Sequence, residues 1–315
     1  MRGWQVALLD VLALCMALVV FSLFHHVLPR QGAAKLQIVR VSAQPAITAA
    51  AATAALAQAA APTPAPGDFS AAFPQESTGE GALHSYQSDG LRIAIDRVQA
   101  DGITYFVADV WIRDISRFQT AFAKGQFGQG FQDRPADIAE EHGAVFAITG
   151  DYYGARAKGV VVRNGVLYRD TSFRDVCVLY ADGVMETYAE EAFDLEAAVA
   201  RKAYQAWSFG PRLLLDGQPI TEFTDSIQRA NPRAALGYYE PGHYCFLLVD
   251  GRQPKYSRGM TLAELSAVFY GLGCKEAYNL DGGQTAAMLF QGELVNQPYE
   301  GGRRVSDIIY FGGEG

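Results

Sequence analysis

The stretch Tyr278-Asn279-Leu280-Asp281-Gly282-Gly283-Gln284-Thr285 contains an apolar run that ends in an acid, with two glycines directly after it. This pattern is typical of a buried strand that delivers one carboxylate to the edge of a pocket. Glycine lets the backbone turn sharply and lets a ligand approach it closely. The same residues would also suit an Asp-Gly hairpin turn, which is a common structure. We call such a strand end, with its polar residues and glycines, a corner. Similar corners elsewhere in the chain favour the interpretation as the edge of a pocket.

A second corner is Ala147-Ile148-Thr149-Gly150-Asp151-Tyr152-Tyr153-Gly154-Ala155-Arg156, where an acid, two tyrosines and an arginine follow an apolar strand. Aromatic rings can stack on the apolar faces of a sugar, and carboxylates can accept hydrogen bonds from its hydroxyl groups. Tyr152 and Tyr153 are therefore expected to form a stacking wall beside Asp151. An aromatic-rich turn is the alternative interpretation.

Two further corners add positive charge. In Asn231-Pro232-Arg233-Ala234-Ala235-Leu236-Gly237, proline fixes the entry to a strand, and the guanidinium of Arg233 can hold a phosphate or carboxylate through two hydrogen bonds. A surface position is the commoner one for such an arginine. In Leu248-Val249-Asp250-Gly251-Arg252, a strand again delivers an acid and a base at its end.

Three acids and at least two arginines at strand ends suit one type of reaction. Hydrolysis at the anomeric carbon of a sugar can use one carboxyl group as acid and another as base or nucleophile. Arginines would stabilise a phosphate group near that carbon. The candidate catalytic residues are Asp281, Asp151 and Asp250. The candidate substrate-binding residues are Arg233, Arg252, Tyr152, Tyr153, Arg156, Asn279, Gly282, Gly283 and Thr285.

The hydrophobic pattern predicts a strand-rich fold. Alternating residues predict strands over 91–98 and 104–112, and the predicted hairpins are 160–168, 176–188, 213–220 and 234–249. Helical spacing predicts helices over 135–141, 194–206 and 262–272, the last with Thr261 and Glu264 as a capping box. The expected fold class is α+β, a mostly antiparallel sheet system with helices packed against it.

The N-terminal part of the chain differs from the rest in composition. Residues 1–28 contain an apolar segment that we interpret as a signal-anchor, a single transmembrane helix, with a cleaved signal peptide as the alternative. Residues 29–82 are an Ala/Pro-rich linker without the means to form a core. The folded domain is expected over residues 83–315. We expect this domain to lie outside the membrane. Basic residues after the apolar segment would favour a cytoplasmic domain, but long domains translocate largely regardless of charge.

Composition and the absence of known motifs exclude several classes of function. The 315 residues are 50% hydrophobic and carry a net charge of -8, which argues against a nucleic-acid partner because such partners need a basic surface. Of the four cysteines, Cys177 and Cys245 lie in apolar runs and are expected as buried thiols, with no disulfide framework or zinc site. No phosphate-binding loop, dinucleotide fingerprint or nucleophile elbow is present. No cofactor is predicted, although the acids leave a divalent cation open.

Over residues 144–311 the sequence resembles the phosphodiester glycosidase family. The segments that carry the resemblance follow in the expected order: Thr149–Gly154, Arg163–Tyr168, Phe209–Pro211, Asn231–Gly237, Asp250–Arg252, Gly259–Leu262, Asn279–Gly283 and Val305–Asp307. The chain departs from the family pattern at Thr149, where asparagine is usual, and at Ala234, Gln284 and Ala286, where smaller or polar residues are usual.

The resemblance implies an enzyme that cleaves a sugar-1-phosphodiester and leaves a phosphomonoester, with Asp281, Asp250, Asp151 and Arg233 on motif positions. It also implies a domain outside the cell membrane that acts on envelope or exopolysaccharide glycans. Two alternatives remain open. One is a catalytically silent glycan-binding or assembly protein, suggested by the changes at Thr149, Gln284 and Ala286. The other is a metal-dependent phosphodiesterase, which the acids allow.

Overall fold

The computed structural model describes residues 16, 30–31, 36–37, 67–74 and 81–313. The expected transmembrane segment, apart from residue 16, and most of the expected linker lie outside these ranges. Within them, no helix is both long enough and apolar enough to cross a membrane.

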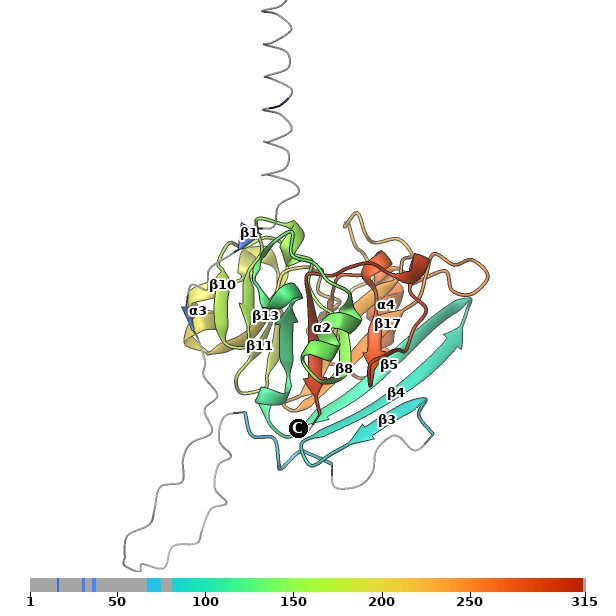
Figure 1. Ribbon diagram of the computed structural model, residues 1–315, viewed down its shortest axis with the longest axis horizontal. Coiled ribbons are helices and arrows are strands. Elements are labelled where there is room, and N and C mark those ends of the chain that lie inside the picture. Colours follow the sequence, from blue (N-terminus) through green and yellow to red (C-terminus); the bar gives the residue numbers. More distant parts are fainter. Residues whose placement is uncertain (1–15, 17–29, 32–35, 38–66, 75–80, 314–315) are drawn as a thin grey trace, which may run out of the picture.

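Three antiparallel sheets surround one shared core (Figure 1). Sheet I contains, in spatial order, β18 (Glu276–Asn279), β16 (Arg233–Glu240), β17 (His243–Val249), β5 (Ile103–Ile112), β4 (Leu91–Ala100) and β3 (His84–Gln87). Sheet II contains β20 (Glu293–Leu294), β19 (Met288–Phe290), β8 (Ala144–Thr149), β21 (Asp307–Gly312) and β6 (Gln119–Phe122). Sheet III contains β12 (Met185–Tyr188), β11 (Val176–Tyr180), β13 (Ala203–Trp207), β9 (Val161–Arg163), β10 (Val166–Arg169) and β2 (Leu36–Gln37).

Two small sheets complete the arrangement. They pair β1 (Arg30–Gln31) with β7 (Gly128–Gln129), and β14 (Leu214–Leu215) with β15 (Gln218–Pro219). Every strand pairing in the described part of the chain is antiparallel. The predicted sheet system is therefore confirmed, and the four predicted hairpins are formed by β9–β10, β11–β12, β14–β15 and β16–β17.

One short helix covers the outer face of each large sheet. The helices are α4 (Leu262–Gly271) on sheet I, α2 (Pro135–Glu141) on sheet II and α3 (Leu195–Ala200) on sheet III. The 3-10 turns are η2 (Ile115–Arg117), η3 (Ala123–Gly125), η4 (Tyr153–Ala155), η5 (Glu190–Ala192), η6 (Gly283–Thr285) and η7 (Tyr299–Gly301). The predicted capping box of Thr261 and Glu264 is present at the start of α4.

The two-residue period of the strands explains this layering. In β17, Tyr244, Phe246 and Leu248 point into the shared core, whereas Cys245 and Leu247 face α4. Successive side chains of a strand point to opposite faces, so a continuous apolar run needs cover on both sides. The shared core covers one side of each sheet, and its helix covers the other.

The helix predicted over 194–206 is wrong in its second half. α3 ends at Ala200, and Lys202 has a φ of 65°, a left-handed conformation that a helix cannot continue. Ala203–Trp207 then forms the central strand β13, paired with β11 and β9. The apolar residues of this segment fit both the 3.6-residue period of a helix and the two-residue period of a strand. Pairing with β11 and β9 favours the strand.

Segments ahead of residue 83 also contact the domain. β1 pairs with β7, β2 pairs with β10, and residues 67–74 place Phe69 and Phe73 in buried positions. Phe69 belongs to the shared core. The sequence predicts that the domain starts at residue 83. In the described ranges, segments before that residue also pack against the domain.

The cysteines of the described region are buried free thiols, as expected for Cys177 and Cys245. The sulfur atoms of Cys245 and Cys274 lie 3.5 Å apart in the layer between sheet I and α4. Both side chains act there as small apolar groups.

Candidate active site

Asp281 stands two residues after β18, where sheet I meets sheet II. Its backbone N–H donates to the carbonyl oxygen of Gly150, 3.0 Å away, just beyond the end of β8. β18 and the following strand β19 belong to different sheets, so the segment between them is not a hairpin turn. The hairpin alternative is therefore wrong, and the acid lies at a junction of two sheets.

The glycine after Asp281 is required by this junction. A Cβ atom at Gly282 would lie 2.6 Å from the carbonyl oxygen of Pro232, which is closer than real contacts allow. Gly283 has a φ of 65° and begins η6. The two glycines therefore set how closely the Asp281 corner approaches the start of β16.

A cavity of about 130 Å³ opens beside Asp281 and brings together five of the candidate residues. These are Asp281, Gly282, Gly283, Arg233 and Arg252. We call this space the Asp281 cavity. Residues far apart in the sequence, from the ends of β16, β17 and β18, thus meet around it.

Asp281 is buried, with 6% of the residue's surface exposed. Burial raises its pKa to about 7, because the charged form loses hydration; nearby Asp151 raises it further, whereas a hydrogen bond from Thr285 and the charges of Arg303 and Arg156 oppose the shift. Asp281 therefore exchanges a proton near neutral pH, which suits acid–base chemistry.

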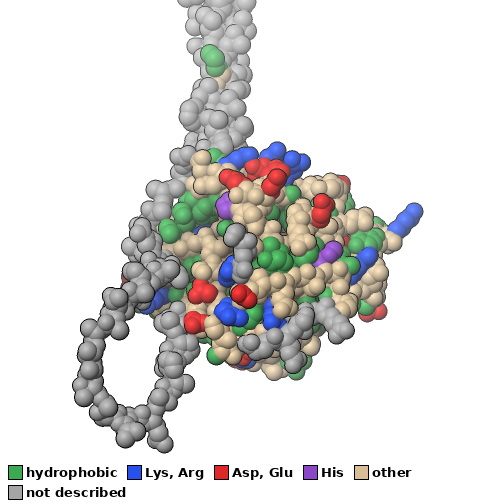
Figure 2. Space-filling view, turned by 60° about the horizontal axis from the view of Figure 1, so that its bottom comes forward, with side chains coloured by type: hydrophobic (Ala, Val, Ile, Leu, Met, Phe, Trp, Pro, Cys, Tyr) green, Lys and Arg blue, Asp and Glu red, His purple; other side chains and the backbone are tan. Residues whose placement is uncertain are grey.

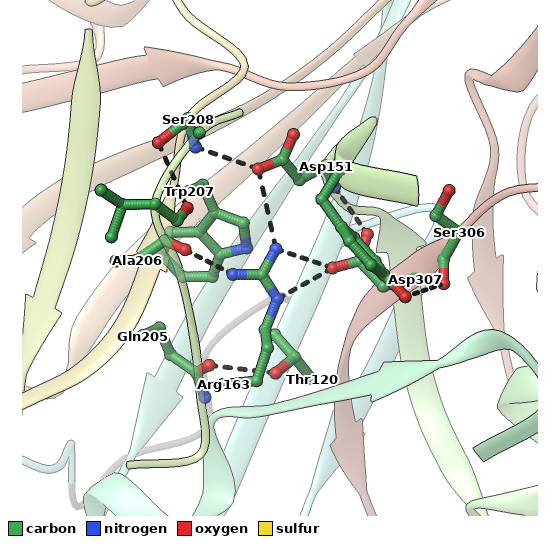
Figure 3. A network of polar contacts seen from close by, with 12 residues as sticks. Thr120, Asp151, Arg163, Gln205, Ala206, Trp207, Ser208, Ser306 and Asp307 are labelled. Atoms are coloured by element: carbon green, nitrogen blue, oxygen red, sulfur yellow. Dashed lines mark hydrogen bonds and ion pairs between the residues drawn. The ribbon is translucent and has the colours of Figure 1, made fainter. Parts of the chain in front are cut away.

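Asp151, which follows β8, belongs to a buried polar network built on Arg163 (Figure 3). Arg163 Nη2 lies 3.7 Å from Asp151 Oδ2 and 2.8 Å from Asp307 Oδ2, and Arg163 Nε donates to Asp307 Oδ2 at 2.9 Å. Asp307 Oδ1 accepts the backbone N–H of Asp151 at 2.7 Å. Charges this deeply buried are stable only when paired, so the network fixes both the backbone and the side chain of Asp151.

The two carboxylate oxygens of Asp151 differ in their surroundings. Oδ2 accepts the backbone N–H of Ser208 at 2.9 Å, whereas Oδ1 has no hydrogen-bond partner in the described part of the chain, although the residue is only 3% exposed. Asp151 is also close enough to Asp281 to raise the pKa of that carboxyl. One oxygen anchors the group and the other is left for a ligand or water.

Asp307 at the start of β21 is fully buried. Burial raises its pKa to about 6, although the Arg163 guanidinium opposes the shift. Both of its oxygens already accept hydrogen bonds within the protein. Its place in the network is therefore to hold Arg163 and the backbone of Asp151.

Arg233 lines the Asp281 cavity but is largely committed to the protein. Its Nε donates to the Met260 carbonyl oxygen at 3.0 Å, and its Nη2 donates to the carbonyl oxygens of Ile227 and Arg229 at 2.6 Å each. Burial and the nearby charge of Arg252 lower its pKa to about 10, so it remains a cation at neutral pH. The expected two-pronged grip on a phosphate is therefore not available, and only Nη1 lacks a hydrogen-bond partner within the described ranges.

Arg252 is exposed at the rim of the same cavity. Its Nε and Nη2 donate to Asn231 Oδ1 at 3.1 Å and 3.0 Å, and its guanidinium lies over the Tyr299 ring. A Cβ atom on Gly283 would lie 3.2 Å from Arg252 Nη2. The positive charge of Arg252 is thus held next to the Asp281 corner.

Asp250 is not among the residues around the Asp281 cavity. Its carboxylate accepts hydrogen bonds from Asn296 Nδ2 at 2.8 Å, the Gln297 N–H at 3.0 Å and the Tyr256 hydroxyl at 3.0 Å. Burial raises its pKa. These bonds fasten a distant loop to the end of β17, so the structure gives Asp250 an anchoring position.

The two tyrosines of the expected stacking wall separate. Tyr153 is 1% exposed, stacks on Phe127 with ring centroids 5.2 Å apart, and belongs to the interior, so its expected sugar-facing role is wrong. Tyr152 is half-buried, with the guanidinium groups of Arg156 and Arg303 each 5.5 Å from its ring centroid. Tyr152 and Arg156 are thus the members of this corner that remain accessible.

Asn279 and Thr285 flank Asp281 on either side. Asn279 Nδ2 donates to the Gly210 carbonyl oxygen at 2.8 Å, while its Oδ1 has no partner in the part of the chain that is described. The Thr149 hydroxyl donates to the carbonyl oxygen of Thr285 and so ties the end of β8 to η6. The residue at 149 therefore supports the Asp281 corner, even though it is not the asparagine that the family resemblance leads one to expect.

Sequence reasoning missed Arg163 and Asp307 as site residues, and also missed Arg303. Arg163 is a charged residue inside the apolar run Val160–Tyr168, and Asp307 directly precedes another apolar run. A charged side chain in a buried strand needs a partner of opposite charge, so each position carried a signal. Their pairing, 144 residues apart, needed the strand order of the folded chain.

No group of three or more His, Cys, Asp and Glu side chains is arranged to hold a metal ion within the described ranges.

On the face drawn in Figure 2, basic side chains lie among acidic and hydrophobic ones.

A family model described as phosphodiester glycosidase matches residues 142–312. The SPbeta prophage-derived uncharacterized protein YomE of Bacillus subtilis (strain 168) is 27% identical over 186 residues, which is 56% of this chain and 29% of the relative. The chain thus spans less than a third of the length of that curated relative.

Two solved structures share the fold. One is the zebrafish N-acetylglucosamine-1-phosphodiester alpha-N-acetylglucosaminidase catalytic domain, auto-inhibited by its pro-peptide, with a TM-score of 0.58, 18% identity, and coverage of 74% of this chain and 86% of that one. The other is a hypothetical protein from Synechocystis, with a TM-score of 0.55, 15% identity, and coverage of 73% and 64%.

Proposed function

The chain belongs to the phosphodiester glycosidase family, a class of hydrolases that act on phosphodiester-linked sugars, and from this premise we propose that it hydrolyses the sugar–oxygen bond of a sugar-1-phosphodiester in an envelope or exopolysaccharide glycan. One observation carries the proposal. A buried carboxyl with a pKa of about 7, Asp281, shares a cavity with two arginines, Arg233 and Arg252. This set of groups matches what the reaction needs, a proton acceptor beside positive charge.

In the proposed reaction, water attacks the anomeric carbon and the bond from that carbon to the bridging oxygen breaks. The bonding electrons stay on the oxygen, which leaves as part of a phosphomonoester, and the sugar is released with a free hydroxyl group. Asp281 accepts the proton lost by the water and later returns it to the solvent. The hydroxyl group of the water is thus found on the released sugar, and its other hydrogen leaves as the proton.

We assign Asp281 as base rather than acid because of the leaving group. A phosphomonoester has a second pKa of about 6, so it leaves as an anion near neutral pH without needing a proton. A base works best when its pKa lies near the working pH, and the pKa of Asp281 meets this condition. The positive charges of Arg252 and Arg233 would stabilise the departing phosphate.

Asp151 has a different proposed part. Glycoside hydrolysis passes through a transition state with positive charge on the sugar ring. A carboxylate anchored through Oδ2, with Oδ1 unpartnered in the described part of the chain, can stabilise that charge without moving. The Arg163–Asp307 pair would keep Asp151 in place during the reaction.

The experiment that tests the function is turnover of a panel of sugar-1-phosphodiesters in water enriched in oxygen-18. We expect release of free sugar with the heavy isotope on the sugar rather than on the phosphate. Label in the phosphate would instead indicate cleavage of a P–O bond, as in a phosphodiesterase. No turnover over the whole panel, with a glycan still bound, would favour the silent binding protein.

The location is proposed separately. We propose that the domain lies outside the cell membrane, tethered by residues 1–28 through the Ala/Pro-rich segment, because envelope glycans are found there. A reporter enzyme that is active only outside the cytoplasm, fused after residue 315, should be active. An inactive fusion that is present in full length would contradict this location.

A further inference from the structure

A second, larger space adjoins the candidate site. It has a volume of about 470 Å³, and Thr285 and Arg303 line it. Both residues also act on the Asp281 carboxyl, the first through a hydrogen bond and the second through its charge. Pockets for small ligands have volumes of about 300–1,000 Å³, so this space is large enough for a sugar unit beside the one that reacts at Asp281. We call it the arginine groove.

Arg303 is the least constrained of the charged residues in the arginine groove. Its side chain is exposed, lies over the Tyr152 ring, and has no carboxylate within salt-bridge distance in the described part of the chain. A guanidinium in this condition has its donors available for an anion. The guanidinium of Arg156 also lies over the Tyr152 ring, 5.5 Å from its centroid. The two guanidinium groups therefore form a line of positive charge from the groove to the Asp281 corner.

The other two arginines keep the groove positive even though they are paired. Arg134 donates to Asp137 at 3.0 Å. Arg304 lies 2.7 Å from Asp133, which also pairs with Lys124, so two cations share one carboxylate. The groove is lined by three arginines and one carboxylate, so it attracts anions although the chain has a net charge of -8.

Apart from Asp137 and Thr285, the other side chains that line the groove are apolar. Leu294 is 51% exposed, one of the few large hydrophobic side chains at the surface of the described part, and Pro135 and Pro298 lie around the same space. An apolar wall suits the carbon–hydrogen face of a sugar ring, while the arginines suit an anionic substituent. The groove therefore has the chemistry of an anionic sugar unit rather than of a neutral sugar or a lipid.

From this arrangement we infer that the arginine groove binds a second anionic group of the substrate, carried by the sugar unit beyond the phosphodiester that is cleaved. The substrate class is then a glycan with negative charges in series, and Arg303 is the residue that selects it. This inference rests on the proposed function of the Asp281 site. The second anion could be a phosphate or a uronic-acid carboxylate, and both present oxygens that a guanidinium binds.

The test compares three sugar-1-phosphodiesters that differ only in the aglycone. The first has a methyl group, the second has a sugar with a phosphate, and the third has a sugar with a carboxylate. We expect Arg303→Ala to lower kcat/KM about 10–100-fold further on one or both charged substrates than on the methyl diester, whose loss reports the effect of Arg303 on Asp281 alone. Measurements at about pH 9 keep Asp281 ionised in every variant, because that pH is about two units above its pKa.

Arg201→Ala is the matched control, because Arg201 is an exposed arginine at the C-terminal end of α3 that lines neither the groove nor the Asp281 cavity. An equal loss on all three substrates would overturn the inference, since Arg303 would then act at the cleaved phosphodiester. No loss on any substrate would also overturn it. Which charged substrate is affected identifies the second anion.

Binding separates this inference from the proposed function. The affinity of the parent for the free phosphorylated and carboxylated aglycone sugars can be measured by calorimetry without any turnover. If the parent hydrolyses nothing but binds one of these sugars, and Arg303→Ala weakens that binding about tenfold, the groove is supported and the proposed reaction is not. If the parent binds neither sugar, the groove assignment is overturned whatever the turnover.

Discussion

Asp281 and Asp307 are both buried acids with raised pKa values, yet their surroundings differ. Asp307 has both oxygens bonded within the protein and a guanidinium at 2.8 Å. Asp281 has no ion pair within salt-bridge distance in the described ranges, and it faces a cavity. Burial with a partner produces a fixed structural element, and burial without one leaves a carboxyl that can act on a ligand in the cavity.

This contrast indicates how the fold divides its tasks. The Arg163 network joins β9, β21 and the end of β8, and it holds Asp151 through two contacts. The Asp281 corner lies beside it, joined to β8 through the Gly150 carbonyl oxygen. A rigid network next to an unpaired acid is the arrangement that pre-organises a reaction site.

The largest expected effect is on activity. Asp281→Asn should lower kcat/KM by about 10²–10⁴-fold, the usual contribution of a general base. The fold should remain intact and its free energy of unfolding at neutral pH should be equal or higher, because a buried charge is removed. Steady-state kinetics and urea unfolding measure the two quantities on the same sample.

Asp307→Asn is the matched control for this change, since it alters a buried acid that has its partners. Its main effect should be on stability, and its loss of activity, which would come through the position of Asp151, should be smaller than that of Asp281→Asn. The assignment of Asp281 fails if Asp281→Asn keeps full activity, or if both variants lose activity and stability to the same extent.

The next effect is on stability. Arg163→Met should lower the free energy of unfolding by about 3–5 kcal/mol, because Asp307 would be left buried and unpaired. Replacing both members, as Arg163→Met with Asp307→Leu, should recover part of this loss, since no uncompensated charge remains at the pair. A loss below about 1 kcal/mol in the single variant would show that the network does not hold the sheets together.

Much of the fold was predictable from local patterns. The Asn164-Gly165 turn has positive φ values of 51° and 76°, as its residues indicate, and the hairpin forms where predicted. The helix over 194–206 was mispredicted because Ala203–Trp207 is suited to either structure by its own residues. Only the presence of β11 and β9 on its two sides decides the outcome.

The candidate site was predictable in part, for a related reason. Strand ends with glycines marked Asp281 and Asp151, and these two acids do lie close together. The direction in which a side chain points was not predictable. Arg233 turns its donors to backbone carbonyl groups, and Tyr153 packs against Phe127. Such choices depend on the packing of segments distant in sequence, which residue type does not specify.

A smaller effect concerns pH. If Asp281 is the base, kcat/KM should rise about tenfold per unit at low pH and level off above about 7, where the carboxyl is ionised. Stability should change in the opposite direction. The folded pKa of Asp281 is raised from 3.8 to about 7, so its contribution to stability is fully present below about pH 4 and is lost as the pH rises through 7.

A comparison of the parent with Asp281→Asn isolates the contribution of Asp281 to the pH dependence of stability. Their difference in the free energy of unfolding should grow between pH 4 and pH 7 by about 1–4 kcal/mol in favour of the variant. Asp307 adds a slope of the same sign that ends near pH 6, and it is present in both proteins. An activity profile that falls as the pH rises through 7 would make Asp281 an acid instead.

The smallest effect is expected at Asp250, the third acid that the sequence places at a strand end. Asp250→Asn keeps one acceptor oxygen for the three donors from Asn296, Gln297 and Tyr256, so it should cost about 1–3 kcal/mol of stability. Activity should change by less than about threefold, because the carboxylate lies among loop donors and not around the Asp281 cavity. Urea unfolding and steady-state kinetics measure both.

The reverse outcome would be informative as well. If Asp250→Asn lowered kcat/KM more than tenfold at unchanged stability, a fully bonded acid would be acting in the chemistry. The distinction drawn between Asp281 and Asp307 would then no longer separate reacting from structural carboxyl groups. A modest stability loss with near-parent activity would instead extend the rule to a third acid, since Asp250, like Asp307, has its oxygens occupied by donors of the protein itself.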